Sequence, residues 1–134
     1  MGGNGARLGV SVKGKPYGTE YETLHTYRNI KFVRYIDASS ARVPLETMTH
    51  GRIYATVNAD NKVKFITYYD KENKKHKEID VIGQEHELPD GRKIIPHTHL
   101  GYYHDERGTR ELTEREKRMV DRVTRIWYNY IAGK

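Results

Sequence analysis

Two neighbouring segments in the middle of the chain alternate between apolar and polar residues, which is the pattern of a half-buried β-strand. They cover residues 52–57 and 62–69, and the residues between them include the turn formers Asn58, Asp60 and Asn61. Two alternating segments on either side of a short polar turn predict a β-hairpin.

The flanking sequence predicts further strands. Residues 30–36 are rich in β-branched and aromatic side chains, which favour extended structure. The segment 78–81 alternates again and follows a polar connection, so we expect it to return along the hairpin. A Pro-Asp-Gly turn at 89–91 precedes a fourth extended segment at 92–100. Together these segments predict an antiparallel meander of four or five strands.

Helices are predicted at both ends of this meander. Thr19 and Glu22 fit a capping box, which predicts a short N-terminal helix over 19–27. Thr113 and Glu116 fit the same signature, and a long C-terminal helix follows them. Its apolar residues fall on one arc at helical spacing: Met119, Val120, Val123, Ile126, Trp127, Tyr130 and Ile131. The predicted class is therefore α+β, with the long helix packed on the sheet.

Glycine is concentrated at the beginning of the sequence. Half of the 12 glycines lie in the first 18 residues, where no hydrophobic period persists. Such a stretch is typical of a flexible arm or linker. We therefore expect an arm over 1–15 and a single α+β domain over 16–134, and this domain could belong to a longer parent protein.

Composition limits the kinds of protein and site that this chain can form. The sequence has no cysteine, which excludes a disulfide framework, a thiolate zinc site and a cysteine nucleophile. No run approaches the roughly 18 apolar residues of a membrane span, and the first residues lack the apolar core of a secretory signal. We expect neither a membrane protein nor export by a Sec signal of its own. The formal net charge is +6, which favours polyanionic partners such as RNA or another nucleic acid.

The histidines are clustered. Four of the seven, His86, His97, His99 and His104, lie within one short part of the sequence. If 93–100 is extended, His97 and His99 project from the same face, and Thr98 points to the other. Their imidazoles would then lie roughly 6 to 7 Å apart, a spacing that can flank a phosphodiester.

This spacing suggests RNA cleavage without a metal or other cofactor. That reaction needs a base, an acid and a group that stabilises the charged phosphorane, and histidine can serve as base or acid near neutral pH. In this interpretation His97 and His99 are acid and base, and Asp80 fixes an imidazole tautomer. The other candidates are His86 and His104 for catalysis, and Arg52, Arg92, Lys93, Tyr102 and Tyr103 for substrate binding.

Two alternatives use the same residues. His86, His97, His99 and Asp80 could bind zinc, because an HxH strand motif with another histidine and a carboxylate supplies a common ligand set. The HxH motif is permissive and does not by itself identify a metal site. The other alternative is a strand end whose imidazoles form only local hydrogen bonds and catalyse nothing.

Four segments resemble a module found in phage and prophage proteins, often behind a phage minor head protein. They are PLETMTHGRIYATV at 44–57, ITYYDKENKKHKEID at 66–80, PHTHLGYYHDE at 96–106 and LTEREKRMVDRV at 112–123. The similarity covers most of 16–131. The module is similar to the phage-associated members of the barnase, EndoU, colicin and RelE group of toxin-like nucleases.

The resemblance implies a small α+β nuclease that cleaves RNA without a metal, in the bacterial cytoplasm or the phage virion. The positions carried over are Ile79 and Asp80, His86, and the motifs at 96–99 and 101–104. The stretch between Asp80 and His97 is longer and less rich in histidine than in the relatives, which leaves the role of His86 open. The alternative is a non-enzymatic virion or assembly module that associates with phage head or portal proteins.

Overall fold

The computed structural model of this chain describes residues 21–36, 43–81, 86–87, 91, 93–94, 96–102 and 108–134. For 86–87 and 93–94 the description covers the backbone alone. The arm expected over 1–15 lies outside these residues. Among the described residues, no helix has both the length and the apolar character needed to cross a bilayer.

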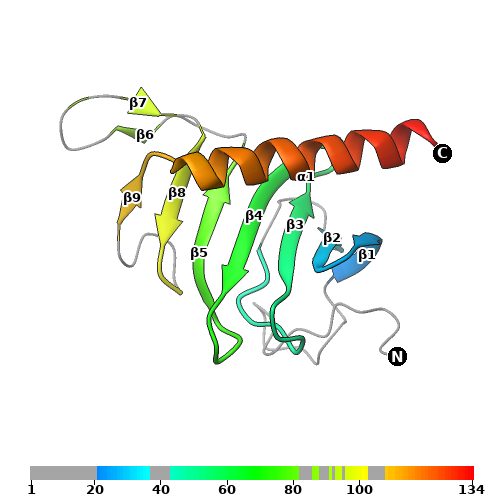
Figure 1. Cartoon of the computed structure of the whole chain (residues 1–134), viewed down its shortest axis with the longest axis horizontal. Coiled ribbons are helices and arrows are strands. Elements are labelled where there is room, and N and C mark those ends of the chain that lie inside the picture. The colour runs from blue at the N-terminus through cyan, green and yellow to red at the C-terminus, as the bar shows by residue number, and fades with distance from the viewer. Residues whose placement is uncertain are drawn as a thin grey trace.

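The described part of the chain forms one large sheet, one small sheet and one helix (Figure 1). The seven-stranded sheet has the order β1-β2-β3-β4-β5-β8-β9, and β6 and β7 form the two-stranded sheet. The strands are β1 (Tyr21–Tyr27), β2 (Ile30–Tyr35), β3 (Ile53–Val57), β4 (Val63–Tyr69), β5 (Lys75–Asp80), β6 (His86–Glu87), β7 (Lys93–Ile94), β8 (His97–Leu100) and β9 (Thr109–Arg110); the helix is α1 (Glu114–Ala132).

Pairing in the large sheet is antiparallel except between β2 and β3, which are parallel. The α+β class and the predicted hairpin, now β3 and β4, are confirmed. The predicted number of strands is too low. The segment expected as one strand over 92–100 is divided between β7 and β8, which belong to different sheets, and Pro96 directly precedes β8. A proline has no N–H to give to a strand ladder, so a strand boundary at this position is expected.

The short helix predicted over 19–27 is wrong for the residues described, because 21–27 form strand β1. A tight turn joins β1 to β2, with Arg28 in the left-handed region at φ 56°. Tyr21 pairs with Tyr35 and is buried against its ring. An isolated helix of this length is marginal in water, whereas the apolar strand β2 offers β1 a partner along its whole length.

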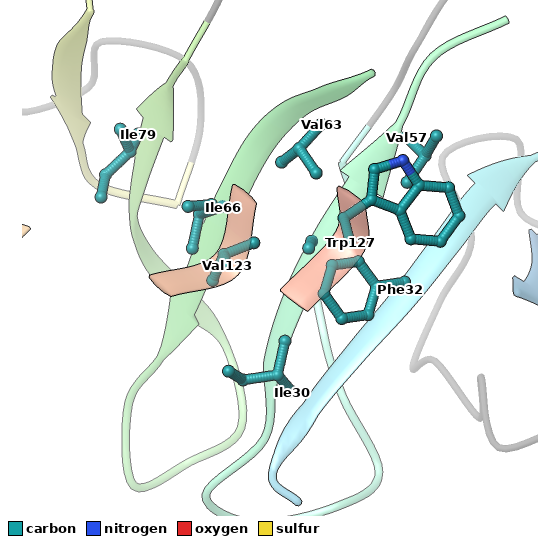
Figure 2. Close-up of a cluster of buried hydrophobic side chains, with 9 residues drawn as sticks. Ile30, Phe32, Val57, Val63, Ile66, Ile79, Val123 and Trp127 are labelled. Carbon is teal, nitrogen blue, oxygen red and sulfur yellow. The ribbon is translucent and has the colours of Figure 1, made fainter. Parts of the chain in front are cut away.

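Helix α1 crosses one face of the large sheet, from the side of β9 to the side of β1 (Figure 1). Val123 and Trp127 are buried against strands β2 to β5, and the Trp127 ring stacks on Phe32 with 5.3 Å between ring centroids (Figure 2). The Trp127 indole N–H donates to the carbonyl of Asn61 at 2.8 Å. The predicted apolar arc is confirmed, since all its members lie in this core or pack against it.

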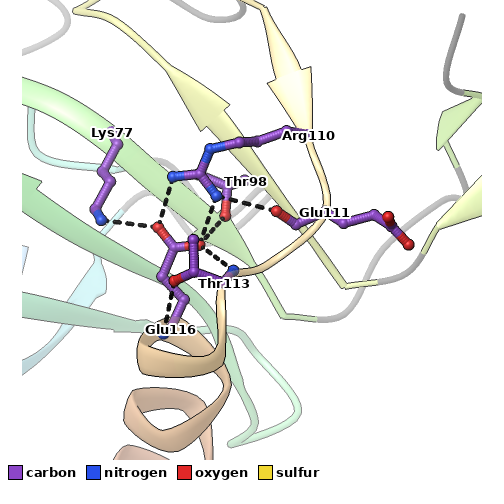
Figure 3. A network of polar contacts seen from close by, with 6 residues as sticks. All are labelled: Lys77, Thr98, Arg110, Glu111, Thr113 and Glu116. Carbon is purple, nitrogen blue, oxygen red and sulfur yellow. Dashed lines mark hydrogen bonds and ion pairs between the residues drawn. The ribbon is translucent and has the colours of Figure 1, made fainter.

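The start of α1 is attached to the sheet through Glu116, which is 1% exposed (Figure 3). The predicted capping box with Thr113 is present. The same carboxylate also accepts hydrogen bonds from the Arg110 guanidinium at 2.8 and 2.9 Å, the Lys77 ammonium at 2.7 Å and the Thr98 hydroxyl at 3.0 Å. One buried side chain therefore joins the helix to β5, β8 and β9.

The other face of the sheet, called the second face below, is polar although it is buried. Because side chains alternate along a strand, the residues on this face lie between those that face α1. A hydrophobic cluster of Tyr21, Val33, Tyr35 and Tyr54 covers one part of it. Polar residues of the same face are each less than 9% exposed: Lys31, Thr56, Thr67, Lys75, Glu78, Asp80, His97 and His99. Buried polar groups need partners, so this face is where chemistry is expected.

Candidate functional site

Neighbouring strands bring Asp80, His97 and His99 together. In the antiparallel pair β5 and β8, Asp80 is opposite His97 and Glu78 is opposite His99. Both histidines lie on the second face, as their spacing predicts. Thr98 points to the helix face, where it donates to Glu116. The predicted sharing of one face is therefore confirmed, and strand pairing adds Asp80 to the pair.

The nitrogen atoms of the two imidazoles face each other. Nε2 of His97 lies 2.9 Å from Nε2 of His99, with ring planes at 86° and centroids 4.5 Å apart. The Asp80 carboxylate lies 3.6 Å from Nε2 of His97. The rings are thus closer than the 6 to 7 Å expected from strand geometry, because both side chains turn toward the same point. Two nitrogens at this distance leave no room for a phosphate group between them.

This cluster is buried: His97 is 0%, His99 is 1% and Asp80 is 8% exposed. On its far side, Nδ1 of His99 lies 3.2 Å from the Thr109 hydroxyl of β9. A protonated Nδ1 that donates to Thr109 leaves Nε2 of His99 with its lone pair toward His97 and Asp80. In that tautomer His99 can accept a proton or a metal ion at Nε2.

Burial and neighbouring charges shift the pKa of the Asp80 carboxyl in opposite directions. Burial raises the pKa of its carboxyl, and the nearby Lys64 ammonium and His99 oppose this rise. Nζ of Lys64 lies 3.6 Å from the second carboxylate oxygen. Lys64 lies where the pairing of β3 and β4 shifts register. The alternation of the sequence therefore did not predict that Lys64 lies beside Asp80. Thr109 was missed as well, because only the pairing of β8 with β9 brings it near His99.

The donor set of the cluster matches that of a metal site. One ligand atom from each of Asp80, His97 and His99 lies within 4.8 Å of the others. Zinc is held by imidazole nitrogens and carboxylate oxygens at about 2.0–2.2 Å, so ligands of one ion lie about 3–3.5 Å apart. Two of the three separations, 2.9 Å between the histidines and 3.6 Å between His97 and Asp80, are within a few tenths of an ångström of that range. Two imidazoles and one carboxylate are a ligand set of zinc and non-haem iron sites.

Two predicted substrate-binding residues lie elsewhere. The Tyr102 hydroxyl donates to the carboxylate of Glu46 at 3.0 Å. Arg52 lies directly before β3 and has a buried Nε. Neither belongs to the cluster of Asp80 and the two histidines. His104, Tyr103 and Arg92 lie outside the described residues, as do the side chains of His86 and Lys93.

Comparison of the chain with family models, curated proteins and solved structures found no match. The resemblance to phage nuclease modules therefore stays a prediction, and the functional argument depends on the geometry of the site.

Proposed function

We propose that this chain is a metal-binding domain, in which Asp80, His97 and His99 hold one divalent transition-metal ion, zinc before the others. The observation that carries the proposal is the convergence of two imidazole nitrogens and a carboxylate on one point of the second face. Burial disfavours the charged form of the Asp80 carboxyl, and a bound cation would stabilise that charged form.

The surrounding residues support the role of each ligand. Thr109 orients His99 through Nδ1, in the way that outer partners of metal-bound histidines fix ring orientation. Lys64 balances the charge of Asp80 on the side away from His97. Three protein ligands are the number found in catalytic zinc sites, where the remaining position holds water. A bound zinc would supply a water molecule of lowered pKa for hydrolysis, and the net charge of +6 favours an anionic substrate.

Metal titration tests this proposal. After treatment with a chelator and dialysis, the protein is expected to take up one zinc or cobalt ion per chain, with a rise in Tm. Loss of a second-sphere partner already weakens metal sites by about 10–100-fold, so His97→Ala or His99→Ala should weaken binding by at least about 100-fold. Isothermal titration and the visible absorption of bound cobalt measure the affinity.

The matched control is His50→Ala, because His50 is exposed and lies outside the cluster. Asp80→Asn keeps the size of the side chain and serves if the alanine variants do not fold. Sub-stoichiometric metal in the wild-type protein, or equal affinity in Asp80→Asn and the wild type, would contradict the proposal.

RNA cleavage without a metal is the second candidate function. It is favoured by the contact of the two imidazoles, in which a single proton can be shared beside a carboxylate. For this reaction the rings would have to separate and admit a phosphodiester, since the nitrogens are in contact. The partner would be RNA or another nucleic acid, as the charge of the chain suggests.

Cleavage assays on RNA in the presence of a chelator test this second candidate. If it is correct, the wild-type protein and His50→Ala cleave RNA in chelator, and His97→Ala and His99→Ala lose about 100-fold or more of the rate, as expected for loss of a general acid or base. Unchanged cleavage in both variants would remove this candidate. Cleavage that appears only with added zinc favours the metal-dependent reaction. No turnover under either condition favours the assembly role, with phage head or portal proteins as partners.

A further inference from the structure

Two cationic side chains, those of Lys31 and Arg52, lie on the second face at strands β2 and β3, whereas the two histidines lie on the same face at strand β8. Lys31 of β2 lies between Ile30 and Phe32, which both face helix α1, so its side chain projects to the second face. The parallel pairing of β2 and β3 places Lys31 beside Tyr54. Arg52 precedes Tyr54 by two residues in the extended chain and therefore shares its face.

Among the described residues, no carboxylate balances the charges of this pair. Lys31 is 5% exposed, and Nε of Arg52 is buried and has no hydrogen-bond partner among the residues that the structure describes. Within the part of the chain that the structure describes, neither side chain forms an ion pair with a carboxylate. Burial lowers the pKa of the Lys31 ammonium, and the charge of Arg52 lowers it further. Two cations held together in this way raise the energy of the folded protein.

Three other lysines of the sheet each have a carboxylate partner. Lys64 has Asp80 at 3.6 Å, Lys77 has Glu116 at 2.7 Å, and the buried Lys75 contacts Glu78 directly. These lysines on the inner strands therefore each have a carboxylate from a neighbouring residue or element. Lys31 is more buried than Lys64 or Lys77, and the charged neighbour that acts on it within the described part of the chain is another cation, Arg52.

Residues next to Lys31 and Arg52 are held in place by hydrogen bonds. The Tyr54 hydroxyl bonds with the Thr47 hydroxyl at 3.1 Å. The side-chain amide of Asn29 donates to the carbonyl of Gly51 at 3.2 Å, and Gly51 adopts φ 78°, a conformation that glycine accepts without strain. These bonds fix the chain that leads into Arg52, so the guanidinium is attached to an ordered part of the fold. Arg52 itself is only partly buried and can be reached from solvent.

We propose that Lys31 and Arg52 form a binding site for a phosphate monoester, such as the 5′-phosphate of a nucleotide or of a nucleic-acid end. A guanidinium presents a planar fork of donors that fits phosphate oxygens, and an ammonium adds a point charge. A phosphate monoester carries about −1.5 to −2 charges near neutral pH, which balances two cations, whereas a diester carries about one. This site is separate from the histidine cluster and does not depend on the proposed metal.

Thermal unfolding in chelator, with inorganic phosphate, AMP and dimethyl phosphate as probes, tests the site. Phosphate and AMP are expected to raise the Tm of the wild-type protein, and dimethyl phosphate much less. At about 100 times the Kd, the ratio of folded to unfolded protein rises about 100-fold. Lys31→Met should lose this response. In the absence of phosphate it should be no less stable than the wild type, because it removes a buried unpaired charge.

Arg122→Ala is the control, because Arg122 is exposed on helix α1, away from the second face. Arg52→Gln is the second variant and must also lose the response; it carries the test if Lys31→Met does not fold. An equal response to phosphate in Arg52→Gln and Arg122→Ala, or no response of the wild type at millimolar phosphate, would overturn the proposal. Equal stabilisation by dimethyl phosphate would overturn the assignment to a monoester.

Discussion

Replacing Glu116 with alanine is expected to lower the free energy of unfolding by about 3–5 kcal/mol, because it removes several hydrogen bonds to one buried charged group, each worth about 1.5–3 kcal/mol. The substitution leaves the partly exposed guanidinium of Arg110 and the partly exposed Lys77 ammonium without their carboxylate. It also removes the capping contact to the backbone of Thr113. Urea unfolding followed by circular dichroism measures the change.

The control for this substitution is Glu114→Ala, on the same turn of the helix. Glu114 is exposed and pairs with the exposed Lys117, and such pairs contribute about 0–1 kcal/mol. Equal effects of Glu114→Ala and Glu116→Ala would show that Glu116 does not join the helix to the sheet.

Stability should also depend on pH through Glu116. Burial by itself raises the pKa of this carboxyl, but hydrogen bonds from Arg110 and Lys77 outweigh it and hold the pKa well below the ordinary 4.5. Because the folded-state pKa is depressed, this stabilisation is fully present above about pH 4.5 and is lost as the pH falls toward the folded value. Glu116→Gln should reduce the slope of stability against pH in this acidic range.

Breaking the ion pair of Lys75 and Glu78 is expected to have an effect of similar size. The two side chains are 2% and 4% exposed and contact each other directly on the second face. Either Lys75→Met or Glu78→Leu leaves one buried charge without its partner, which should cost about 3–5 kcal/mol. The double variant buries no charge, and we expect its stability to lie within about 1–2 kcal/mol of the wild type.

A double-mutant cycle from urea unfolding tests this expectation. The two single effects should sum to far more than the effect of the double variant. Additive effects would mean that the two residues act independently, which would contradict the pairing. Lys117→Ala with Glu114→Ala supplies the exposed comparison, for which the coupling should be below about 1 kcal/mol.

The elements that the sequence predicted well are those determined by local patterns. The hairpin of β3 and β4 has strict alternation around a polar turn, and α1 has a capping box followed by an apolar arc. The residues around Thr19 and Glu22 carry the same capping signature without a long apolar arc, and 21–27 form an edge strand instead. Local signatures are overridden where a neighbouring strand offers more contacts than a short helix can provide.

The site could be predicted only in part. Spacing alone placed His97 and His99 on one face, and Asp80 was a correct candidate neighbour for them. Burial and the contact of the two nitrogens could not be foreseen, because both depend on how β5, β8 and β9 pair. The burial of Lys31 could not be predicted from the sequence for a similar reason. A lysine in an apolar strand looks like a solvated residue until the parallel pairing of β2 and β3 is known.

The helix that covers the apolar face of the sheet comes after all seven of its strands in the chain. During synthesis the strands therefore leave the ribosome before Val123 and Trp127 are available to cover Ile30, Phe32 and Ile66. The nascent sheet has to expose this apolar surface to solvent until α1 emerges, and such surfaces attract chaperones and other unfinished chains. A ribosome stalled before α1 should thus carry an aggregation-prone intermediate, and release of the helix should end that vulnerability.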